Sequence, residues 1–370
     1  MTFALITHVG HVKTDGQLLA YGPYVREMNL WAQHVDHVVL VAPAKHTGVD
    51  PIDLAYKHTN ITWLKVPAFS TTSLGQLLRS ILVVPWILLQ IFRAFIRADH
   101  IHLRAPGNMA ILGLLVQVFF PSKKKTAKYA GNWDPNAKQP VSYRLQKRML
   151  ASSWFACNMR VLVYGAWPNQ SKNVLPFFTA TYSKNEIPWE ARDWQSPVRM
   201  LFIGTLGPGK RPLYALQLFK SLYNKGLVGK LDYFGDGPEK PTLLDFVKRH
   251  DLSGAVQLHG NRPAAEVNSA YKTADFLILP SQSEGWPKVV AEAMYWGCIP
   301  VVTPISCVPW MLDHGERGML LSLVVEIDSQ AIADILIDPN RAKQMRELAV
   351  TWSRSYTLDR FDTEIQKLLK

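Results

Sequence analysis

The sequence predicts an α/β protein made of two doubly wound parallel-sheet domains. Short apolar runs alternate with helical stretches along the whole chain, the pattern of parallel sheets. The 370 residues are enough to build a core in each of two domains. A polar, proline-containing break at residues 183–197 separates an N-terminal domain, 1–182, from a C-terminal domain, 198–352. We expect residues 353–370 to form a helix that crosses back to the first domain.

The N-terminal domain is predicted from apolar runs, each of a length typical of a buried strand. These runs are Thr2–Thr7, His37–Val41, Ile61–Lys65, His100–Leu103, Thr126–Ala130 and Arg160–Tyr164. The C-terminal domain is predicted from a second series of such runs. They are Arg199–Ile203, Lys230–Phe234, Val256–His259, Phe276–Leu279, Ile299–Thr303 and Met319–Leu321.

The net positive charge lies in the first half of the chain. Residues 1–180 contain 19 Lys and Arg against 7 Asp and Glu, whereas residues 181–370 contain 22 of each kind. The first half also holds two apolar segments, Ser80–Leu89 and Met109–Phe120, each shorter than the roughly 20 residues of a spanning helix. Two interpretations stay open: helices buried in a doubly wound domain, or a surface that rests on anionic lipid. Nucleic acid is not an expected partner, because no nucleic-acid-binding motif is present.

Cysteine usage and the N-terminal sequence both bear on location. Cys157, Cys298 and Cys307 show no metal-ligand spacing, which favours a reducing compartment. No signal peptide is recognised at the start of the sequence. We therefore expect a cytoplasmic protein, peripheral on the inner face of the cell membrane if the basic half binds lipid.

The stretch from residue 281 to 302 combines two carboxylates with a strand, a turn and a helix. Glu284 lies in the turn after a strand, and Glu292 lies about one and a half turns into a helix predicted over Lys288–Trp296. Ligands of open α/β sheets bind at this end of the strands. The first amides of the helix, Lys288–Val290, would bind an anion, and the two carboxylates could accept hydrogen bonds from sugar hydroxyls.

These residues resemble a known family. Glu284–Met294, followed by Gly297–Val302, is similar to the E-x7-E signature of the family 4 retaining glycosyltransferases, including bacterial enzymes of surface-polysaccharide assembly. Further blocks similar to the family are Val198–Gly204, Gly235–Glu239 and Leu258–Arg262. The resemblance extends over about residues 198–325. It implies the GT-B fold, in which two Rossmann-like doubly wound parallel-sheet domains face a cleft.

The resemblance also implies an activity and a set of site residues. The chain would move a hexosyl-type sugar from a UDP- or GDP-sugar donor to a glycan or lipid-linked acceptor with retention of configuration (EC 2.4), without metal or other cofactor. Catalytic roles fall to Glu284 at the sugar, to Lys210 at the diphosphate, and to His102 from a stretch similar to the family's H-x-H. The residues implied in donor binding are Gly10, Gly204, Lys210, Arg211, Gly260, Asn261, Gly285, Trp286, Pro287, Lys288, Val289, Val290 and Glu292.

The loop Gly204–Arg211 supports two interpretations. It nearly matches a P-loop, but Arg211 occupies the position where that motif needs a hydroxyl for Mg²⁺. It is also similar to the family loop whose Arg and Lys neutralise the diphosphate, with Lys210 in place and Thr205 where the Arg is usual. We predict that Arg211 supplies the missing cation. A P-loop phosphotransferase, a nonhydrolysing sugar-nucleotide epimerase of the same fold and a non-catalytic binding protein stay open as alternatives.

Overall fold

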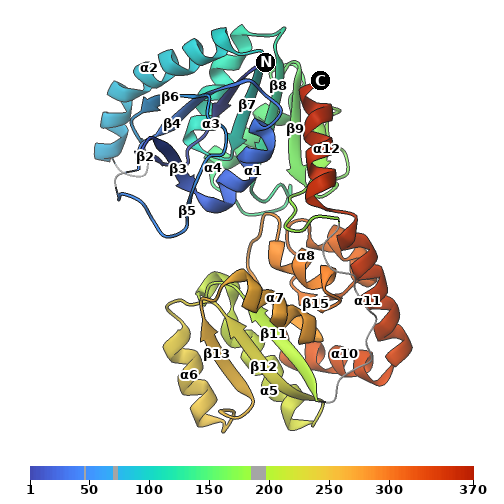
Figure 1. Cartoon of the computed structure of the whole chain (residues 1–370). Coiled ribbons are helices and arrows are strands. Elements are labelled where there is room, and N and C mark those ends of the chain that lie inside the picture. The colour runs from blue at the N-terminus through green and yellow to red at the C-terminus, as the bar shows by residue number, and fades with distance from the viewer. Residues whose placement is uncertain (46, 70–73, 185–196) are drawn as a thin grey trace. The chain divides into compact units, whose positions relative to one another are not determined.

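The chain folds into two compact units (Figure 1). The computed structural model describes residues 1–45, 47–69, 74–184 and 197–370. Unit 1 comprises residues 1–177 and 361–370, and unit 2 comprises residues 178–360. Most of the predicted linker, residues 185–196, lies outside the described residues.

Unit 1 is built on a seven-stranded parallel sheet with the order β10-β9-β8-β7-β1-β4-β6. Its strands are β1 (Thr2–Ile6), β4 (His37–Pro43), β6 (Ile61–Val66), β7 (His100–Ala105), β8 (Lys124–Tyr129), β9 (Met159–Tyr164) and β10 (Val174–Phe177). Its helices are α1 (Gly22–Ala32), α2 (Leu74–Arg97), α3 (Asn108–Val116), η1 (Gln117–Phe119), α4 (Val141–Ala151) and the end of α12 (Leu358–Leu369). The strand order reverses between β1 and β7, where ligands of such sheets bind.

Helices cover both faces of this sheet, and this explains why its strands are continuous apolar runs. Ala4 and Ile6 of β1 belong to a core that also contains Ile91 of α2. The alternate residue Phe3 stacks on Trp31 of α1 at 5.8 Å between ring centroids. Successive side chains of a strand point to opposite faces, so one short apolar strand contributes to two packed layers.

Residues after β1 form a hairpin. β2 (His11–Thr14) pairs antiparallel with β3 (Gln17–Tyr21), and β5 (Asp53–Ala55) completes a small three-stranded sheet. Asp15 and Gly16 connect β2 to β3 with φ of 49° and 76°, as a type I′ turn requires. The proposed role of Gly10 in phosphate binding is not supported, because Gly10 precedes this hairpin, not a helix, and lies against the backbone of Lys45.

A buried charge cluster holds the end of α12 in unit 1. Phe361 of α12 lies 5.3 Å from Phe177 between ring centroids, and the Lys128 ammonium lies 4.9 Å from the centre of the Phe361 ring. Lys128 is fully buried and pairs at 3.0 Å with Glu27, which also pairs with Arg104. One carboxylate therefore compensates two buried cations beneath the C-terminal helix.

Unit 2 contains a six-stranded parallel sheet with the order β13-β12-β11-β14-β15-β16. Its strands are β11 (Val198–Ile203), β12 (Val228–Phe234), β13 (Val256–Gly260), β14 (Phe276–Leu279), β15 (Ile299–Val302) and β16 (Met319–Leu320). Its helices are α5 (Pro212–Asn224), α6 (Lys240–Arg249), α7 (Ala264–Thr273), α8 (Lys288–Tyr295), α9 (Val308–Met311), α10 (Val325–Ile337) and α11 (Pro339–Arg354), with the short turns η2 (Pro208–Lys210) and η3 (Asp313–Gly315). The predicted class of two doubly wound parallel-sheet domains is confirmed.

Candidate functional site

The loops after β11 and β12 touch at the carboxyl edge of the unit 2 sheet because glycines allow it. A Cβ atom on Gly235 would lie 2.0 Å from the carbonyl oxygen of Gly204, and one on Gly237 would lie 2.5 Å from that of Leu206. Side chains larger than hydrogen would force the two loops apart. The glycines of the Gly235–Glu239 block therefore fix the position of the loop that carries Lys210.

Lys210 and Glu284 form an ion pair in unit 2. The backbone amide of Gln282 donates to the carbonyl of Gly209 at 2.8 Å, which joins the loop after β11 to the loop after β14. The side chains of Lys210 and Glu284 are 29% and 12% exposed, so a ligand can reach a pair that is otherwise enclosed. The structure thus brings together two residues that the sequence places 74 positions apart.

Arg211 lies next to this pair along the chain but turns to a different partner. It adopts a left-handed conformation with φ of 48°, and its Nη1 donates to the carbonyl of Pro280 at 3.2 Å. Pro280 directly follows β14 and is close in sequence to Glu284. The Arg211 guanidinium therefore lies at the carboxyl edge of the sheet. Both cations of the loop therefore contact the segment that follows β14.

Each carboxylate oxygen of Glu292 accepts a hydrogen bond from a hydroxyl group. Oε1 accepts from Thr181 at 2.8 Å, and Oε2 accepts from Tyr271 at 3.2 Å. Burial raises the pKa of the Tyr271 phenol well above its usual value, so the phenol stays protonated and donates. Tyr271 also donates to the carbonyl of Val289, which ties it to α8. The half-buried Glu292 is thus already arranged as an acceptor of paired hydroxyls.

If a ribose diol binds Glu292, the Glu292→Ala variant should bind nucleotide about 10- to 100-fold more weakly, because a hydrogen bond to a charged group contributes roughly 1.5–3 kcal/mol. Isothermal titration calorimetry with UDP and GDP measures this. The Thr181→Val control removes a hydroxyl that competes for Glu292, so its affinity should be equal to or higher than that of the parent. Unchanged affinity in a folded Glu292→Ala variant would show that Glu292 does not hold the nucleotide.

Two side chains of a neighbouring loop hold the backbone that follows Glu284. The carbonyl of Gly285 accepts hydrogen bonds from Ser306 Oγ at 3.1 Å and from Cys307 Sγ at 3.2 Å. Burial raises the pKa of the Cys307 thiol to about 12, which keeps the thiol protonated and able to donate. These contacts restrict the backbone that presents Glu284 to a ligand.

Trp286 was predicted to contact the donor, but its side chain is buried among other aromatic rings. Rings of the described residues that lie within 6.2 Å of it, measured between centroids, include those of Trp310, Trp352 and Tyr356. A ring surrounded in this way anchors the loop to the rest of unit 2. The predicted donor contact from this side chain is therefore not supported, because packing leaves it only 7% exposed.

The start of α8 differs slightly from the predicted anion site. Pro287 is the residue before the first helical position, and the amide of Val290 donates to the Pro287 carbonyl at 3.0 Å. The predicted set of donors is thereby reduced to the amides of Lys288 and Val289. Gly297 follows the end of the helix with φ of 75°, as is common for a glycine in that position.

Gly260 and Asn261 lie at the end of β13, two strands from β11 in the sheet. The carbonyl of Gly260 accepts from the Gly235 amide at 2.9 Å, and Gly260 has φ of 72°. Asn261 is exposed. These residues share the carboxyl edge of the sheet with Lys210, as parallel pairing requires.

His102 does not lie at a site in unit 1. Its side chain is fully buried and bonds through Nδ1 to Thr126 Oγ1 at 2.8 Å. It packs against Phe3 and Trp31, at 5.5 and 4.5 Å between ring centroids. Burial lowers its pKa well below the ordinary value, so the ring is neutral. The predicted contact of His102 with the transferred sugar is therefore not supported, since the side chain belongs to the layer between sheet and α1.

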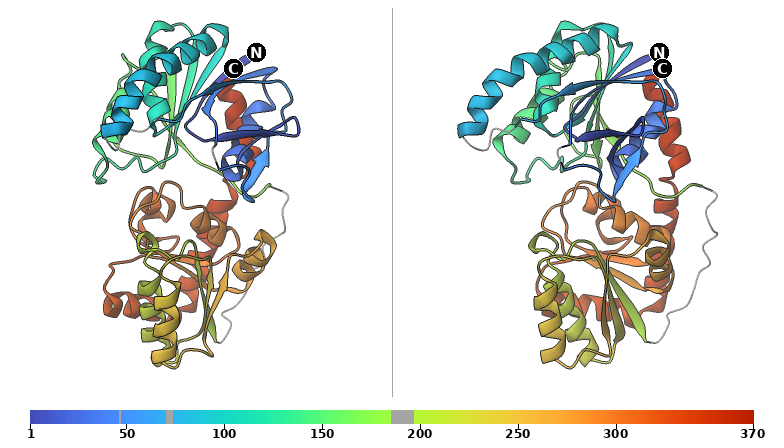
Figure 2. Two further views of the ribbon diagram at one scale, coloured as in Figure 1. Left: turned by 90° about the vertical axis from the view of Figure 1, so that its left-hand side faces the viewer. Right: turned by 60° about the vertical axis from the view of Figure 1, so that its left-hand side comes forward.

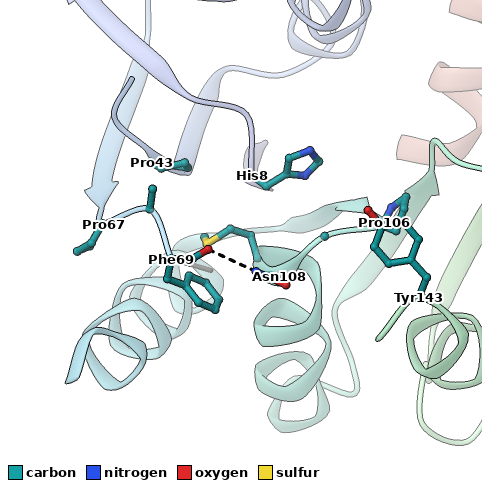
Figure 3. A pocket seen from close by; sticks show the side chains of 10 residues that line it. His8, Pro43, Pro67, Phe69, Pro106, Asn108 and Tyr143 are labelled. Atoms are coloured by element: carbon teal, nitrogen blue, oxygen red, sulfur yellow. Dashed lines mark hydrogen bonds between the residues drawn. The ribbon is translucent and has the colours of Figure 1, made fainter. Parts of the chain in front are cut away.

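Unit 1 contains a cavity of about 310 Å³ at the carboxyl edge of its own sheet (Figure 3). Its lining is mostly apolar with a few polar side chains, and consists of His8, Pro43, Pro67, Ala68, Phe69, Pro106, Gly107, Asn108, Met109 and Tyr143. Figure 3 shows His8, Asn108 and Tyr143 around the opening, with the amide of Asn108 bonded to the carbonyl of Phe69 at 3.3 Å. A Cβ atom on Gly107 would lie 2.8 Å from the His8 ring, so a larger residue there would displace the exposed His8 side chain.

This cavity was not predicted from the sequence. Most of its residues lie at the end of β4 or in segments that follow β1, β6 and β7, neighbours in the sheet with the order β7-β1-β4-β6, and Tyr143 lies on α4. The available signal was the set of residues placed directly after predicted strands, since parallel strands bring those positions to one edge.

Residues 183–352, most of unit 2, match the family described as glycosyl transferases group 1. A protein of Salmonella typhimurium named putative colanic acid biosynthesis glycosyltransferase WcaL is 30% identical over 39% of this chain and 36% of its own length. The amylovoran biosynthesis glycosyltransferase AmsK of Erwinia amylovora is 29% identical over 38% of this chain and 35% of its length. The chain thus aligns with about a third of each relative. The predicted resemblance is confirmed.

The fold of the whole chain matches solved structures. The Anabaena protein Alr3699/HepE, crystallised with UDP and glucose, has a TM-score of 0.64 at 13% identity and covers 100% of this chain and 98% of that chain. The similarity at this identity concerns the fold. The chain has the GT-B fold, as predicted.

Proposed function

Because the chain has the GT-B fold and residues 183–352 match the glycosyl transferases group 1, we propose that it is a glycosyltransferase of polysaccharide biosynthesis. It takes a sugar from a nucleoside-diphosphate sugar, a UDP- or GDP-sugar, and transfers it to a glycan or lipid-linked acceptor. Retention of configuration follows from the family resemblance. The observation that carries the proposal is the Lys210–Glu284 ion pair at the carboxyl edge of the unit 2 sheet.

In this proposal the donor binds unit 2 through three kinds of group. Glu292 accepts the ribose hydroxyls, and the amides of Lys288 and Val289 bind a phosphate at the positive end of α8. Lys210 binds the diphosphate, and contacts with phosphate oxygens replace part of its contact with Glu284. Glu284 is then released to accept hydroxyls of the sugar.

The chemical step breaks the bond between the anomeric carbon and the diphosphate oxygen. The electron pair of that bond leaves with the diphosphate, and the sugar passes through an oxocarbenium-like state before the acceptor hydroxyl bonds to the anomeric carbon. As the bond forms, that hydroxyl passes its proton to the diphosphate oxygen that has left the anomeric carbon. Negative charge grows on the diphosphate during the step, so Lys210 stabilises the transition state more than the bound donor.

The acceptor is assigned to the cavity of unit 1. Its apolar walls suit the faces of sugar rings or the first part of a lipid carrier, and His8, Asn108 and Tyr143 offer polar groups to hydroxyls (Figure 3). Its volume of about 310 Å³ falls at the lower end of ligand sites. A carrier of that kind would place the enzyme at the inner face of the cell membrane.

The bonding of the loop after β11 disfavours a P-loop phosphotransferase. A P-loop directs its backbone amides at phosphate groups. Here several amides of the loop donate instead to backbone carbonyls of the protein: those of Gly204, Leu206, Gly207, Lys210 and Arg211. These amides are therefore used within the protein, partly by the loop itself and partly by β12 and the residues that follow it, and the loop presents side chains such as Lys210 to a ligand.

A thermal-shift panel of nucleotide sugars tests the proposal. The matching donor should raise the melting temperature, because a ligand that binds only the folded state stabilises it by mass action. Nuclear magnetic resonance of the product with that donor and an acceptor then reports the anomeric configuration. A panel without any stabilising nucleotide, or conversion of the donor without an acceptor, would contradict the proposal, and the second result would favour the epimerase.

Arg211 is expected to assist the leaving diphosphate in place of the arginine missing at Thr205. The Arg211→Ala variant should lower kcat more than it weakens donor binding, because the charge that Arg211 would meet develops in the transition state. The Thr205→Arg change in that background should recover part of the rate. Steady-state kinetics measures both. A value of kcat/KM within about twofold of the parent would show that Lys210 and the α8 amides act without Arg211.

A further inference from the structure

Helix α2 exposes an unusual amount of apolar surface. The buried side of the helix includes Ile87, Ile91 and Phe95, which pack in the core of unit 1. The opposite side consists of Ile81, Leu82, Trp86, Leu89, Phe92 and Ile96, all exposed, with Leu82 at 81%. Both views of Figure 2 show α2 along the outside of unit 1. Soluble proteins rarely leave one whole side of a long helix apolar without a partner for it.

This exposed side continues onto the end of α3 and the short turn η1 that follows it. Leu115, Val118 and Phe119 are also exposed, and Phe119 is 71% accessible. The rings of Phe92 and Phe119 lie 6.5 Å apart between centroids, which joins the two segments. We call the exposed residues of α2 and these three residues the apolar face.

The charges beside the apolar face are positive. Arg93 and Arg97 are exposed on α2, and the Arg93 guanidinium lies 5.9 Å from the centre of the Trp86 ring. The α2 sequence Leu74–Arg97 contains no Asp or Glu. Apolar and aromatic side chains with interspersed arginines are typical of helices that lie in the interface of an anionic bilayer, where the cations reach the headgroups.

The packing of α2 indicates how it would meet a bilayer. Among the described helices, α2 is the one long and apolar enough to cross a membrane by length and composition, over Ser80–Arg97. The apolar run Ser80–Leu89 is by itself too short to span a bilayer, but the helix continues to Arg97. A spanning orientation would pull Ile91 and Phe95 out of the unit 1 core, where both are fully buried. A helix lying in the plane of the interface keeps that core intact.

We propose that the apolar face docks unit 1 onto an anionic lipid bilayer, with α2 parallel to the membrane plane. The occupant is lipid rather than another protein surface, because the face combines apolar insertion with arginine charge and belongs to the half of the sequence that holds the entire net charge of +12. This inference rests on the proposed function only for the identity of a membrane-borne acceptor. The docking itself requires neither donor nor acceptor.

Flotation of the full chain with vesicles tests the docking directly. The protein should float with vesicles of phosphatidylcholine and phosphatidylglycerol, float much less with phosphatidylcholine alone, and detach as salt is raised. The double variant Leu82→Glu/Phe119→Glu should reduce the bound fraction at least about tenfold, because both apolar anchors become anionic. Arg93→Ala should weaken binding to the anionic vesicles by about fivefold, the effect of one cation near the surface.

The matched control is Ile337→Glu. Ile337 is 75% exposed at the end of α10 in unit 2, so it places a charge on an equally accessible apolar residue outside the face. It should float like the parent, and melting curves should show that every variant is folded. Equal flotation of the double variant and the parent, or no flotation of the parent, would overturn the proposal. Light scattering that shows a dimer dissociated by Leu82→Glu/Phe119→Glu would assign the face to self-association instead. Nucleotide binding, measured separately, tests the proposed function without vesicles.

Discussion

The Lys210→Ala variant is expected to lose about 10²- to 10³-fold in kcat, the usual effect of removing one preorganised group that stabilises transition-state charge. Lys210 is held by its ion pair with Glu284 on a loop that glycine contacts fix to the sheet. Little reorganisation is therefore needed when charge builds on the leaving diphosphate. Donor affinity should fall by a smaller factor, because the ground state carries less charge on the bridging oxygen.

Steady-state kinetics and donor titration separate these two effects. Lys220→Ala is the matched control: Lys220 lies on α5 of the same unit, and its ammonium contacts His250 and the Phe246 ring. That variant should keep kcat near the parent value. A Lys210→Ala enzyme with kcat within about fivefold of the parent would assign the leaving-group contact to other donors.

The Glu27→Ala variant is expected to lose about 3–5 kcal/mol of folding stability, the cost of leaving a buried charge without its partner. The Glu27 carboxylate compensates both Arg104 and Lys128, and the Lys128 side chain is only 1% exposed. Such a loss is a large fraction of the 5–15 kcal/mol that stabilises a typical domain, so the variant should be marginally stable. Urea unfolding followed by circular dichroism measures the change.

An exposed ion pair provides the control for Glu27. Asp245→Ala removes the partner of Arg249 on α6, where both side chains are more than half exposed, and should change stability by about 0–1 kcal/mol. Lys128→Met in the Glu27→Ala background should recover part of the loss, because it removes one uncompensated cation. A loss below about 1 kcal/mol in Glu27→Ala would mean that the cluster is hydrated and not a buried network.

The parallel sheets could be predicted from sequence because most of their strands are short, mainly apolar runs that both layers of helices bury. β10 escaped prediction, since Val174–Phe177 is short and contains a proline. The β2–β3 hairpin escaped because β2 is a polar strand, although Asp15-Gly16 is a strong signal for its turn. Edge and exposed strands have few apolar residues, so an apolar pattern does not reveal them. Their pairing is set largely by local turns.

The sequence predicts which residues lie at the candidate site, but not which side chains contact one another there. The motif around Glu284 and Glu292 places two acids at the edge of a sheet, and the structure keeps them there. The contact of Glu292 with Thr181 joins residues 111 positions apart, and no local pattern records it. His102 shows the opposite error, since position on a strand does not reveal whether a side chain faces the core or a ligand. Burial decides that, and burial is a property of the assembled layers.

The return of α12 to unit 1 has a consequence for the order in which the chain folds during synthesis. All residues of unit 2, 178–360, are synthesised before residues 361–370, which belong to unit 1. Until then Lys128 lacks the Phe361 ring that covers its ammonium in the finished protein. The unit whose synthesis begins first therefore receives its last buried ring, that of Phe361, only after every residue of unit 2 has been made.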